Sequence, residues 1–248
     1  IERIKEGERD VLWPGLPIYF SKTSGTTSGA KYIPISRESM PYHVSSARNA
    51  LLMYILKTGR SDFLGGRMMF ISGSPELDSS GIIPTGRLSG ISHRHVPGYL
   101  RWRRLPSYEV NCISSWEEKL DAIVRETEQE KMSLISGIPP WVEMYFERLL
   151  KFTGKSSVAE VFPEFSLFVY GGVNFEPYRK QFNKLIPSDK MHYMETYNAS
   201  EGFFGIQDEP SIQDMLLMLD YGVFYEFIPM KEFGKENPEV LTLEEVET

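Results

Sequence analysis

Residues 21–31 of this 248-residue chain, Ser-Lys-Thr-Ser-Gly-Thr-Thr-Ser-Gly-Ala-Lys, combine side chains that suit the phosphates of a nucleotide. The glycines let backbone N–H groups approach a ligand, the hydroxyls donate hydrogen bonds, and the two lysines balance negative charge. The segment is not a Walker loop, because only three residues separate Gly25 from Gly29 and Lys31 does not directly follow the second glycine. It is not the dinucleotide motif G-x-G-x-x-G either. Taken alone, a solvated Ser/Gly linker explains it equally well.

Two further motifs follow apolar, strand-like runs. Gly171-Gly172 comes after residues 168–170, and Thr-Tyr-Asn-Ala-Ser-Glu at 196–201 comes after residues 191–194. Tyr197 offers an aromatic face and Glu201 a hard oxygen ligand for Mg²⁺. Each motif also has a structural explanation: a tight turn, a core tyrosine, or a helix N-cap at Ser200 with Glu201 in the first turn. The three motifs in this order favour a nucleotide site.

The elements that must position these motifs alternate between short apolar strands and amphipathic helices. Strands are expected at 67–72, 134–135, 166–170, 191–197, 203–206 and 221–228, and helices at 36–57, 116–127, 141–152 and 176–185, with a loop at 73–90. This alternation predicts an α/β fold with a mostly parallel sheet flanked by helices. In such sheets ligands bind beyond the carboxyl ends of the strands, where all three motifs are expected to lie.

Composition narrows the partners and the compartment. The net charge of −7 argues against a nucleic-acid partner, since phosphate backbones attract basic surfaces. No apolar run is long enough to span a membrane, and no signal peptide opens the chain, so no membrane partner and a cytoplasmic location are expected. Cys112 is the single cysteine, which permits no internal disulfide and fits a reducing compartment. We expect it to be a buried structural thiol.

The order of several motifs resembles the Gretchen Hagen (auxin-responsive promoter) family of acyl-acid amido synthetases, within the adenylate-forming superfamily. The motifs are Asp-Val-Leu-Trp-Pro-Gly at 10–15 leading into 23–29, the segments 116–120 and 135–141, Tyr-Asn-Ala-Ser-Glu-Gly at 197–202, and 224–229. The similarity spans nearly the whole chain. The phosphate loop with the Tyr-x-x-Ser-Glu element is its specific part, whereas the glycine pair and the helices are not. The absence of plant-specific features is consistent with a bacterial homologue.

The resemblance implies a fold of the adenylate-forming large-domain type, with ATP and Mg²⁺ as cofactors and a small carboxylic acid and an amino acid as substrates. A carboxylate attacks the α-phosphate of ATP, and an amine then displaces AMP to form an amide. This chemistry needs donors and a metal more than an acid–base pair. The residues implied to bind the cofactor are Ser24, Gly25, Thr26, Thr27, Gly29, Gly171, Gly172, Tyr197 and Ser200, with Glu201 as the metal ligand and Glu201 and Thr26 as the catalytic residues.

The chain also departs from the family pattern. The family continues into a Gly-Asp motif and a mobile C-terminal domain bearing a lysine, and begins with helices before the phosphate loop. This chain starts at Ile1 and stops at Thr248 without them. The expectation is that residues 1–248 form the core portion of the ATP-binding large domain and are inactive alone.

Other functions remain open at this stage. An adenylating enzyme could pass its acyl group to the thiol of coenzyme A, and the motifs could belong to a non-catalytic nucleotide-binding module. A serine hydrolase is disfavoured, because no Gly-x-Ser-x-Gly elbow is present.

Several isolated residues carry weaker hypotheses. His93 and His95 could form a metal pair, but without a third ligand they are expected at the edge of a loop or an acyl pocket. Trp141 and Met144 could line an aromatic acid pocket, although their helical spacing fits a core face as well. The basic cluster 101–104 is expected on a solvated face or in ion pairs.

Overall fold

The computed structural model describes residues 1–23, 30–209 and 211–246, and its centre is a twisted sheet. Within these residues the sheet has seven strands: β10 (Leu216–Leu217), β9 (Phe203–Ile206), β8 (His192–Asn198), β7 (Leu167–Tyr170), β6 (Met132–Gly137), β3 (Arg67–Ile71) and β5 (Arg104–Leu105). The strands from β8 to β5 run parallel, and β9 and β10 are antiparallel additions at one edge. The expected mostly parallel sheet is therefore confirmed.

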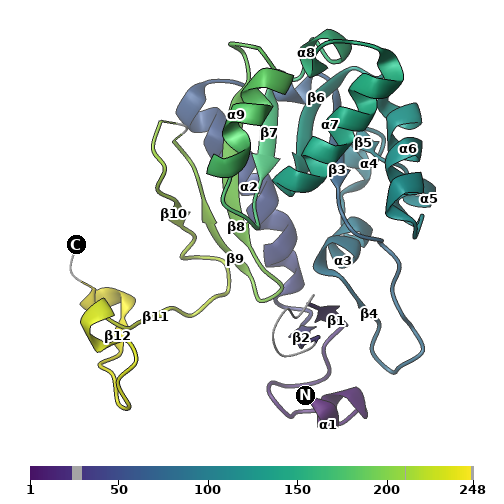
Figure 1. The fold of residues 1–248 in the computed structure, drawn as a ribbon. Coiled ribbons are helices and arrows are strands. Elements are labelled where there is room, and N and C mark those ends of the chain that lie inside the picture. The colour runs from purple at the N-terminus through teal and green to yellow at the C-terminus, as the bar shows by residue number, and fades with distance from the viewer. Residues whose placement is uncertain (24–29, 210, 247–248) are drawn as a thin grey trace.

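Helices cover both faces of this sheet (Figure 1). Helices α6 (Trp116–Thr127), α7 (Pro139–Thr153) and α9 (Glu176–Leu185) pack on one face, and α2 (Met40–Thr58) packs on the other. Neighbouring strand residues alternate between the two cores. Ile135 and Phe168 join the cluster under α6, α7 and α9, whereas Leu134 and Leu167 join the cluster under α2. Burial on both faces explains why these strands read as continuous apolar runs.

A second, smaller sheet lies beyond one end of the large one (Figure 1). In the described residues it consists of β2 (Tyr32–Ile35), β1 (Tyr19–Lys22) and β4 (Thr85–Gly86), with β1 antiparallel to β2 and parallel to β4. Helix α3 (Leu88–Arg94) packs against it, and α1 (Glu2–Lys5) precedes it. The expected loop at 73–90 therefore contains β4 and the start of α3. The run at 18–20 belongs to this small sheet and not to the large one.

Most element boundaries follow local capping chemistry. Helix α9 and strand β9 begin and end where the sequence predicts. Ser115 accepts a hydrogen bond from the Glu118 amide and so starts α6. Helix α2 begins at Met40 and not at Ser36, because Ser36 and Ser39 each accept a hydrogen bond from the other's backbone amide in a turn before the helix. Gly59, at φ 69°, ends α2 as expected.

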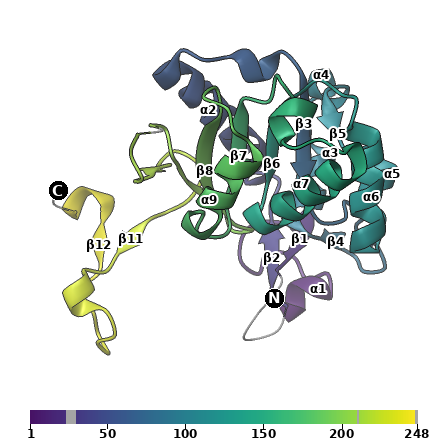
Figure 2. The same cartoon turned by 45° about the horizontal axis from the view of Figure 1, so that its top comes forward.

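The C-terminal part of the described chain extends away from the sheets (Figure 2). Strands β11 (Glu226–Phe227) and β12 (Leu241–Thr242) pair there, and the expected strand at 221–228 is limited to the two residues of β11. The shorter helices α4 (Gly98–Arg101), α5 (Tyr108–Asn111) and α8 (Val158–Val161) connect the main elements. No helix in the described part of the chain is long and apolar enough to cross a membrane.

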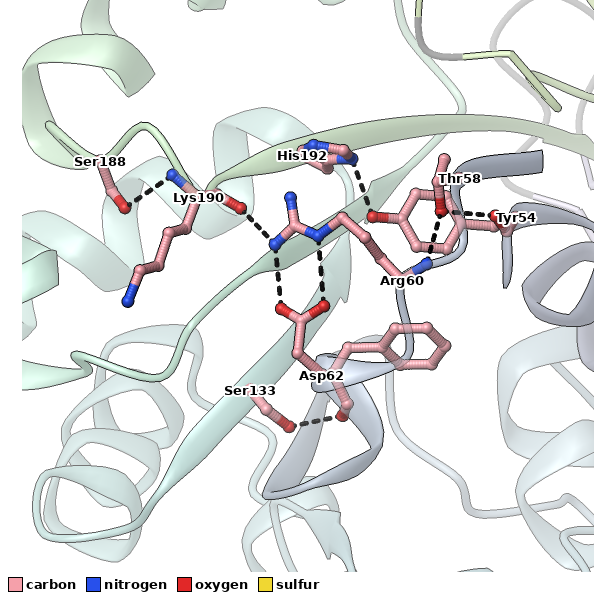
Figure 3. Close-up of polar contacts among 9 residues, drawn as sticks. Tyr54, Thr58, Arg60, Asp62, Ser133, Ser188, Lys190 and His192 are labelled. Carbon is pink, nitrogen blue, oxygen red and sulfur yellow. Dashed lines mark hydrogen bonds and ion pairs between the residues drawn. The ribbon is translucent and has the colours of Figure 1, made fainter. Parts of the chain in front are cut away.

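A polar network fixes the end of α2 to the amino ends of the parallel strands (Figure 3). The Tyr54 hydroxyl is hydrogen-bonded to His192 Nδ1 over 2.8 Å at the start of β8. Arg60 donates to both oxygens of Asp62, at 3.2 and 2.9 Å, and to the Lys190 carbonyl at 2.8 Å. The hydrogen bonds from Arg60 lower the pKa of Asp62 to about 2, and burial, with Arg60, lowers the pKa of His192. The network therefore stabilises the amino ends of the parallel strands, opposite to the carboxyl ends of β7 and β8 that the described motifs follow.

Candidate functional site

The phosphate-loop candidate is the connection of a β-hairpin. Strands β1 and β2 pair from Tyr19 with Ile35 to Lys22 with Tyr32. At the base of the connection the Thr23 amide donates to the Lys31 carbonyl at 3.0 Å, and the Lys31 amide donates to Thr23 Oγ1 at 3.2 Å. The sequence argument placed this segment beyond a strand of the large sheet, and that placement is corrected here. The predicted residues Ser24, Gly25, Thr26, Thr27 and Gly29 lie outside the described residues.

The Tyr197–Glu201 candidate forms the end of a second hairpin, between β8 and β9. The Ala199 amide donates to the Gly202 carbonyl at 2.8 Å, and the Gly202 amide donates back to Ala199 at 3.3 Å. Ser200 and Glu201 occupy the turn between these two bonds. Ser200 is therefore not a helix N-cap. Glu201 is exposed, so its carboxylate is available to a ligand.

A hydrogen bond joins the two hairpins. The Ser21 hydroxyl on β1 donates to Ser200 Oγ over 2.8 Å. Ser21 is fully buried, whereas Ser200 is half-buried. The base of the phosphate-loop candidate and the turn carrying Glu201 are thereby held side by side, although they are far apart in the sequence.

The glycine pair contacts the same strand. A Cβ atom at Gly171 would lie 2.3 Å from the carbonyl oxygen of Thr196, so only glycine allows this close approach of the two chains. Thr196 Oγ1 also donates to the Tyr170 carbonyl at 3.1 Å. Gly172 has a φ of 83°, which glycine adopts most readily. The pair therefore has a structural role in bringing the end of β7 against β8.

Tyr197 presents an accessible ring next to this junction. The residue is 57% exposed, which excludes a core role. One side of the ring is supported by Phe204 on β9, at a centroid distance of 5.2 Å. Tyr225 in turn contacts Phe204 edge to face at 6.4 Å. Aromatic support of this kind leaves the open face of Tyr197 for a planar ligand.

A cavity of about 670 Å³ opens beside the first hairpin. Lys22, Thr23 and Ala30 from the base of the loop line one side, and Asp78 and Arg87 are among the residues of segment 74–87 that line the other. The volume falls in the range of small-molecule sites. The lining carries both signs of charge, so it favours a polar ligand over an apolar one.

The structure bears on two of the weaker hypotheses, the histidine pair and the cysteine. His95, in the turn directly after α3, pairs with the Tyr19 hydroxyl at 3.2 Å, while the ring of His93, in the last turn of α3, lies against Tyr108, so the two imidazoles face different neighbours. Burial and the nearby arginines 104, 101 and 94 lower the pKa of His93 to about 4. Cys112 is only partly buried.

The remaining hypotheses concern large side chains outside the junction of the hairpins. Trp141 packs on Trp116 at a centroid distance of 5.0 Å, and Met144 is 42% exposed. Neither residue lines the cavity beside the first hairpin. The arginines of the 101–104 cluster bind separate partners: Arg101 bonds the Val96 carbonyl, Arg103 the Leu64 carbonyl, and Arg104 stacks on Phe70.

Metal binding rests on one carboxylate. The described residues contain no group of three or more His, Cys, Asp or Glu side chains that could hold a metal ion by themselves. Mg²⁺ in nucleotide sites is commonly held by one or two carboxylates together with substrate phosphates and water. The single exposed Glu201 beside Ser200 fits this mode of binding.

Two residues at the site carried no assignment from the sequence. Ser21 counted only as a hydroxyl of the loop, although its position directly after the β-prone run at 18–20 was a signal that it lies on a strand. Phe204 lies in an apolar run, and nothing in the sequence distinguishes it from a core residue. Both act through residues that the sequence did identify, Ser200 and Tyr197 respectively.

The fold and the junction of the two hairpins define an α/β protein in which the described candidate ligand residues, Gly171, Gly172, Tyr197, Ser200 and Glu201, lie at the carboxyl ends of β7 and β8. The family model "GH3 family N-terminal domain" matches residues 1–99 and 85–191, and the chain belongs to the GH3 family. Its fold is similar to that of AtGH3.15, an acyl acid amido synthetase solved in complex with 2,4-DB, with a TM-score of 0.73, 13% identity, and coverage of 99% of this chain and 52% of that chain.

A second GH3.15 acyl acid amido synthetase structure matches with a TM-score of 0.61 and 11% identity, covering 99% of this chain and 54% of that one. The chain thus spans about half the length of the synthetases it resembles. No match was found among curated proteins. The expected adenylate-forming type of fold is confirmed by the similarity to these synthetases.

Proposed function

We propose that this chain is the nucleotide-binding part of an ATP-dependent ligase that adenylates a small carboxylic acid and transfers the acyl group to the amine of an amino acid. The observation that carries the proposal is the Ser21–Ser200 hydrogen bond, which holds the two candidate phosphate-binding segments together. Membership of the GH3 family supports the reaction class. The acyl acid amido synthetase activity of the structural relatives points the same way.

Each site residue then has a specific task in the proposed reaction. The loop residues Ser24, Gly25, Thr26, Thr27 and Gly29 would surround the triphosphate of ATP with N–H and O–H donors. Such donors stabilise the charge that develops on the α-phosphate when the carboxylate attacks it. Thr26 would be the loop residue closest to the chemistry.

The second hairpin would supply the other contacts. Tyr197 would stack its exposed face on the adenine, with Gly171 and Gly172 allowing the ring to lie against the backbone. Ser200 would donate to a phosphate, and Glu201 would hold Mg²⁺. The metal, when bound, neutralises phosphate charge during the in-line displacement.

The domain assignment is also a proposal. Residues 1–248 would be the core portion of the ATP-binding large domain, in line with coverage of about half of the relatives' chains. We further propose a cytoplasmic location and no membrane partner. We also propose no nucleic-acid partner, because the net charge of −7 disfavours binding to a phosphate backbone.

The test uses the protein that contains this chain, expressed at full length, with ATP, Mg²⁺ and a panel of carboxylic acids. Acid-dependent release of pyrophosphate supports adenylation. Addition of amino acids, or separately of coenzyme A, then identifies the acceptor by mass spectrometry of the product. An amide is expected, and a coenzyme A thioester would replace the proposal by the related synthetase activity. ATP binding without acid-dependent turnover would leave a non-catalytic nucleotide-binding module.

A further inference from the structure

Ser21 opens the segment 21–31 but is not among the individual residues to which a ligand contact is assigned above. Its hydroxyl is fully buried on β1, on the opposite face of the strand from the equally buried Phe20. A buried hydroxyl requires a hydrogen-bond partner, and the partner here is Ser200 Oγ at 2.8 Å. A strand residue with no ligand contact is thus bonded directly to a candidate ligand residue.

The direction of this bond matters for Ser200. A serine hydroxyl has one proton to donate and lone pairs that accept. Because Ser200 accepts the proton of Ser21, its own proton is directed elsewhere and remains available to an acceptor such as a phosphate oxygen. Ser21 therefore sets both the position and the polarity of the Ser200 hydroxyl.

The bond also restrains the turn that carries Glu201. That turn is closed by the Ala199–Gly202 backbone pair, and both of its central side chains are at least partly accessible. On β1 the bond starts from Ser21, two residues before Thr23, and Thr23 closes the base of the phosphate-loop candidate. One hydroxyl thus connects the loop base to the metal-binding candidate.

We infer that Ser21 is a positioning residue for nucleotide binding, acting through Ser200 to hold the β8–β9 turn, which carries Glu201, in a fixed position against β1. The inference rests on the proposed function, because it assumes that the β8–β9 turn contacts Mg·ATP. It requires no contact between Ser21 and the nucleotide.

A double-mutant cycle tests this with a non-hydrolysable ATP analogue, whose Kd is measured by calorimetry with Mg²⁺ and with EDTA, on the full-length protein. Ser21→Ala should raise the Kd with Mg²⁺ by about 2- to 10-fold, the range expected for one hydrogen bond. Ser200→Ala should raise it by at least as much. The double variant should match Ser200→Ala alone, because Ser21 acts only through Ser200.

Ser133→Ala is the matched control for loss of a buried hydroxyl. Ser133 is 1% exposed and donates to the Phe63 carbonyl at 2.6 Å at the amino end of β6, far from the two hairpins. This variant should lower the melting temperature without changing the Kd. Ser21→Cys keeps the volume and a weak donor. It should give a Kd between those of the wild type and Ser21→Ala, and it provides a second folded variant if Ser21→Ala melts early.

The outcomes separate this inference from the proposed function. A Ser21→Ala protein with a wild-type Kd and a lower melting temperature would show that Ser21 is only structural. Independent effects that multiply in the double variant would also overturn the inference. A wild-type protein that does not bind the Mg²⁺–analogue complex at all would overturn the proposed function and this inference together.

Discussion

The Oγ atoms of Ser21 and Ser200 lie 2.8 Å apart, although the residues are separated by 179 positions in the chain. Ser21 belongs to the small sheet and Ser200 to the hairpin at the edge of the large one. The candidate nucleotide site is therefore assembled by the docking of two separately built hairpins. Each of the following predictions tests a part of that assembly.

Removal of the Glu201 carboxylate should weaken Mg²⁺-dependent nucleotide binding. For Glu201→Ala we expect the Kd of the Mg²⁺–nucleotide complex to rise by about tenfold or more, the order seen when a metal site loses a supporting ligand. The Kd measured in EDTA should change little. Glu164→Ala, which removes an exposed glutamate before β7, is the control and should bind normally. Unchanged affinity and turnover in Glu201→Ala would refute the metal role.

A side chain at Gly171 should separate β7 from β8. The added Cβ of Gly171→Ala would lie 2.3 Å from the Thr196 carbonyl, so the backbone must shift at a cost of about 1–3 kcal/mol in the free energy of unfolding. Gly98→Ala is the control, because no atom lies within 4 Å of its added Cβ. Denaturant titration of both variants measures the difference. Equal stabilities would contradict the close approach of the two strands.

The aromatic pair should contribute to adenine binding in a graded way. Tyr197→Ala removes the exposed ring and should cost about 1–3 kcal/mol of nucleotide affinity, whereas Tyr197→Phe should retain most of it. Phe204→Ala leaves the Tyr197 ring without its support at 5.2 Å and should give a smaller loss. Calorimetric Kd values for ATP measure the loss of affinity in each variant. A Tyr197→Ala protein with wild-type affinity would place adenine elsewhere.

Stability should fall on acidification because of His192. Its pKa in the folded protein is below the ordinary value of 6.5, so the unfolded chain takes up the proton first as the pH falls. The contribution of neutral His192 is present above about pH 6.5 and is lost progressively below it, because burial and Arg60 disfavour the protonated imidazole in the folded protein. His43, His93 and His95 also have lowered pKa values and add to the same trend.

The contribution of His192 to this pH dependence is measured by thermal melts of wild type and His192→Asn between about pH 7.5 and 5, a range that spans the ordinary histidine pKa. The variant should show the weaker pH dependence. Parallel curves for His192→Asn would show that His192 does not contribute to the pH dependence of stability.

Asp62 affects stability in a lower pH range than the histidines, since its pKa of about 2 lies below the ordinary 3.8. Its ion pair with Arg60 is lost as the pH falls from about 3.8 to about 2, so Asp62→Asn should leave the melts above pH 5 parallel to wild type.

Local chemistry made the large sheet predictable. Residues 176–185 and 203–206 have boundaries marked by proline, glycine or a change in periodicity, and the structure reproduces them. Strand β2 was missed because it contains Pro34, which strands tolerate at an edge, and β2 is the edge strand of its sheet. The two-residue strands β4, β5 and β10 are held by neighbouring strands and have no periodicity of their own.

The candidate site was predictable in its residue types and not in its contacts. Tyr197 and Glu201 could be selected because an exposed aromatic and a carboxylate after a strand suit a nucleotide. The Ser21–Ser200 bond depends on how two sheets dock, and neither residue carries a sequence signal for the other. The same holds for Gly171, whose close approach to Thr196 becomes visible only when β7 and β8 are adjacent.

The central claim, that the site adenylates a carboxylic acid, is tested most directly by exchange of labelled pyrophosphate into ATP by the full-length protein. The account predicts label in ATP only when Mg²⁺ and a substrate acid are both present, and loss of most of that exchange in Glu201→Ala. Exchange that does not depend on any acid, or that persists at the wild-type rate in Glu201→Ala, would contradict it.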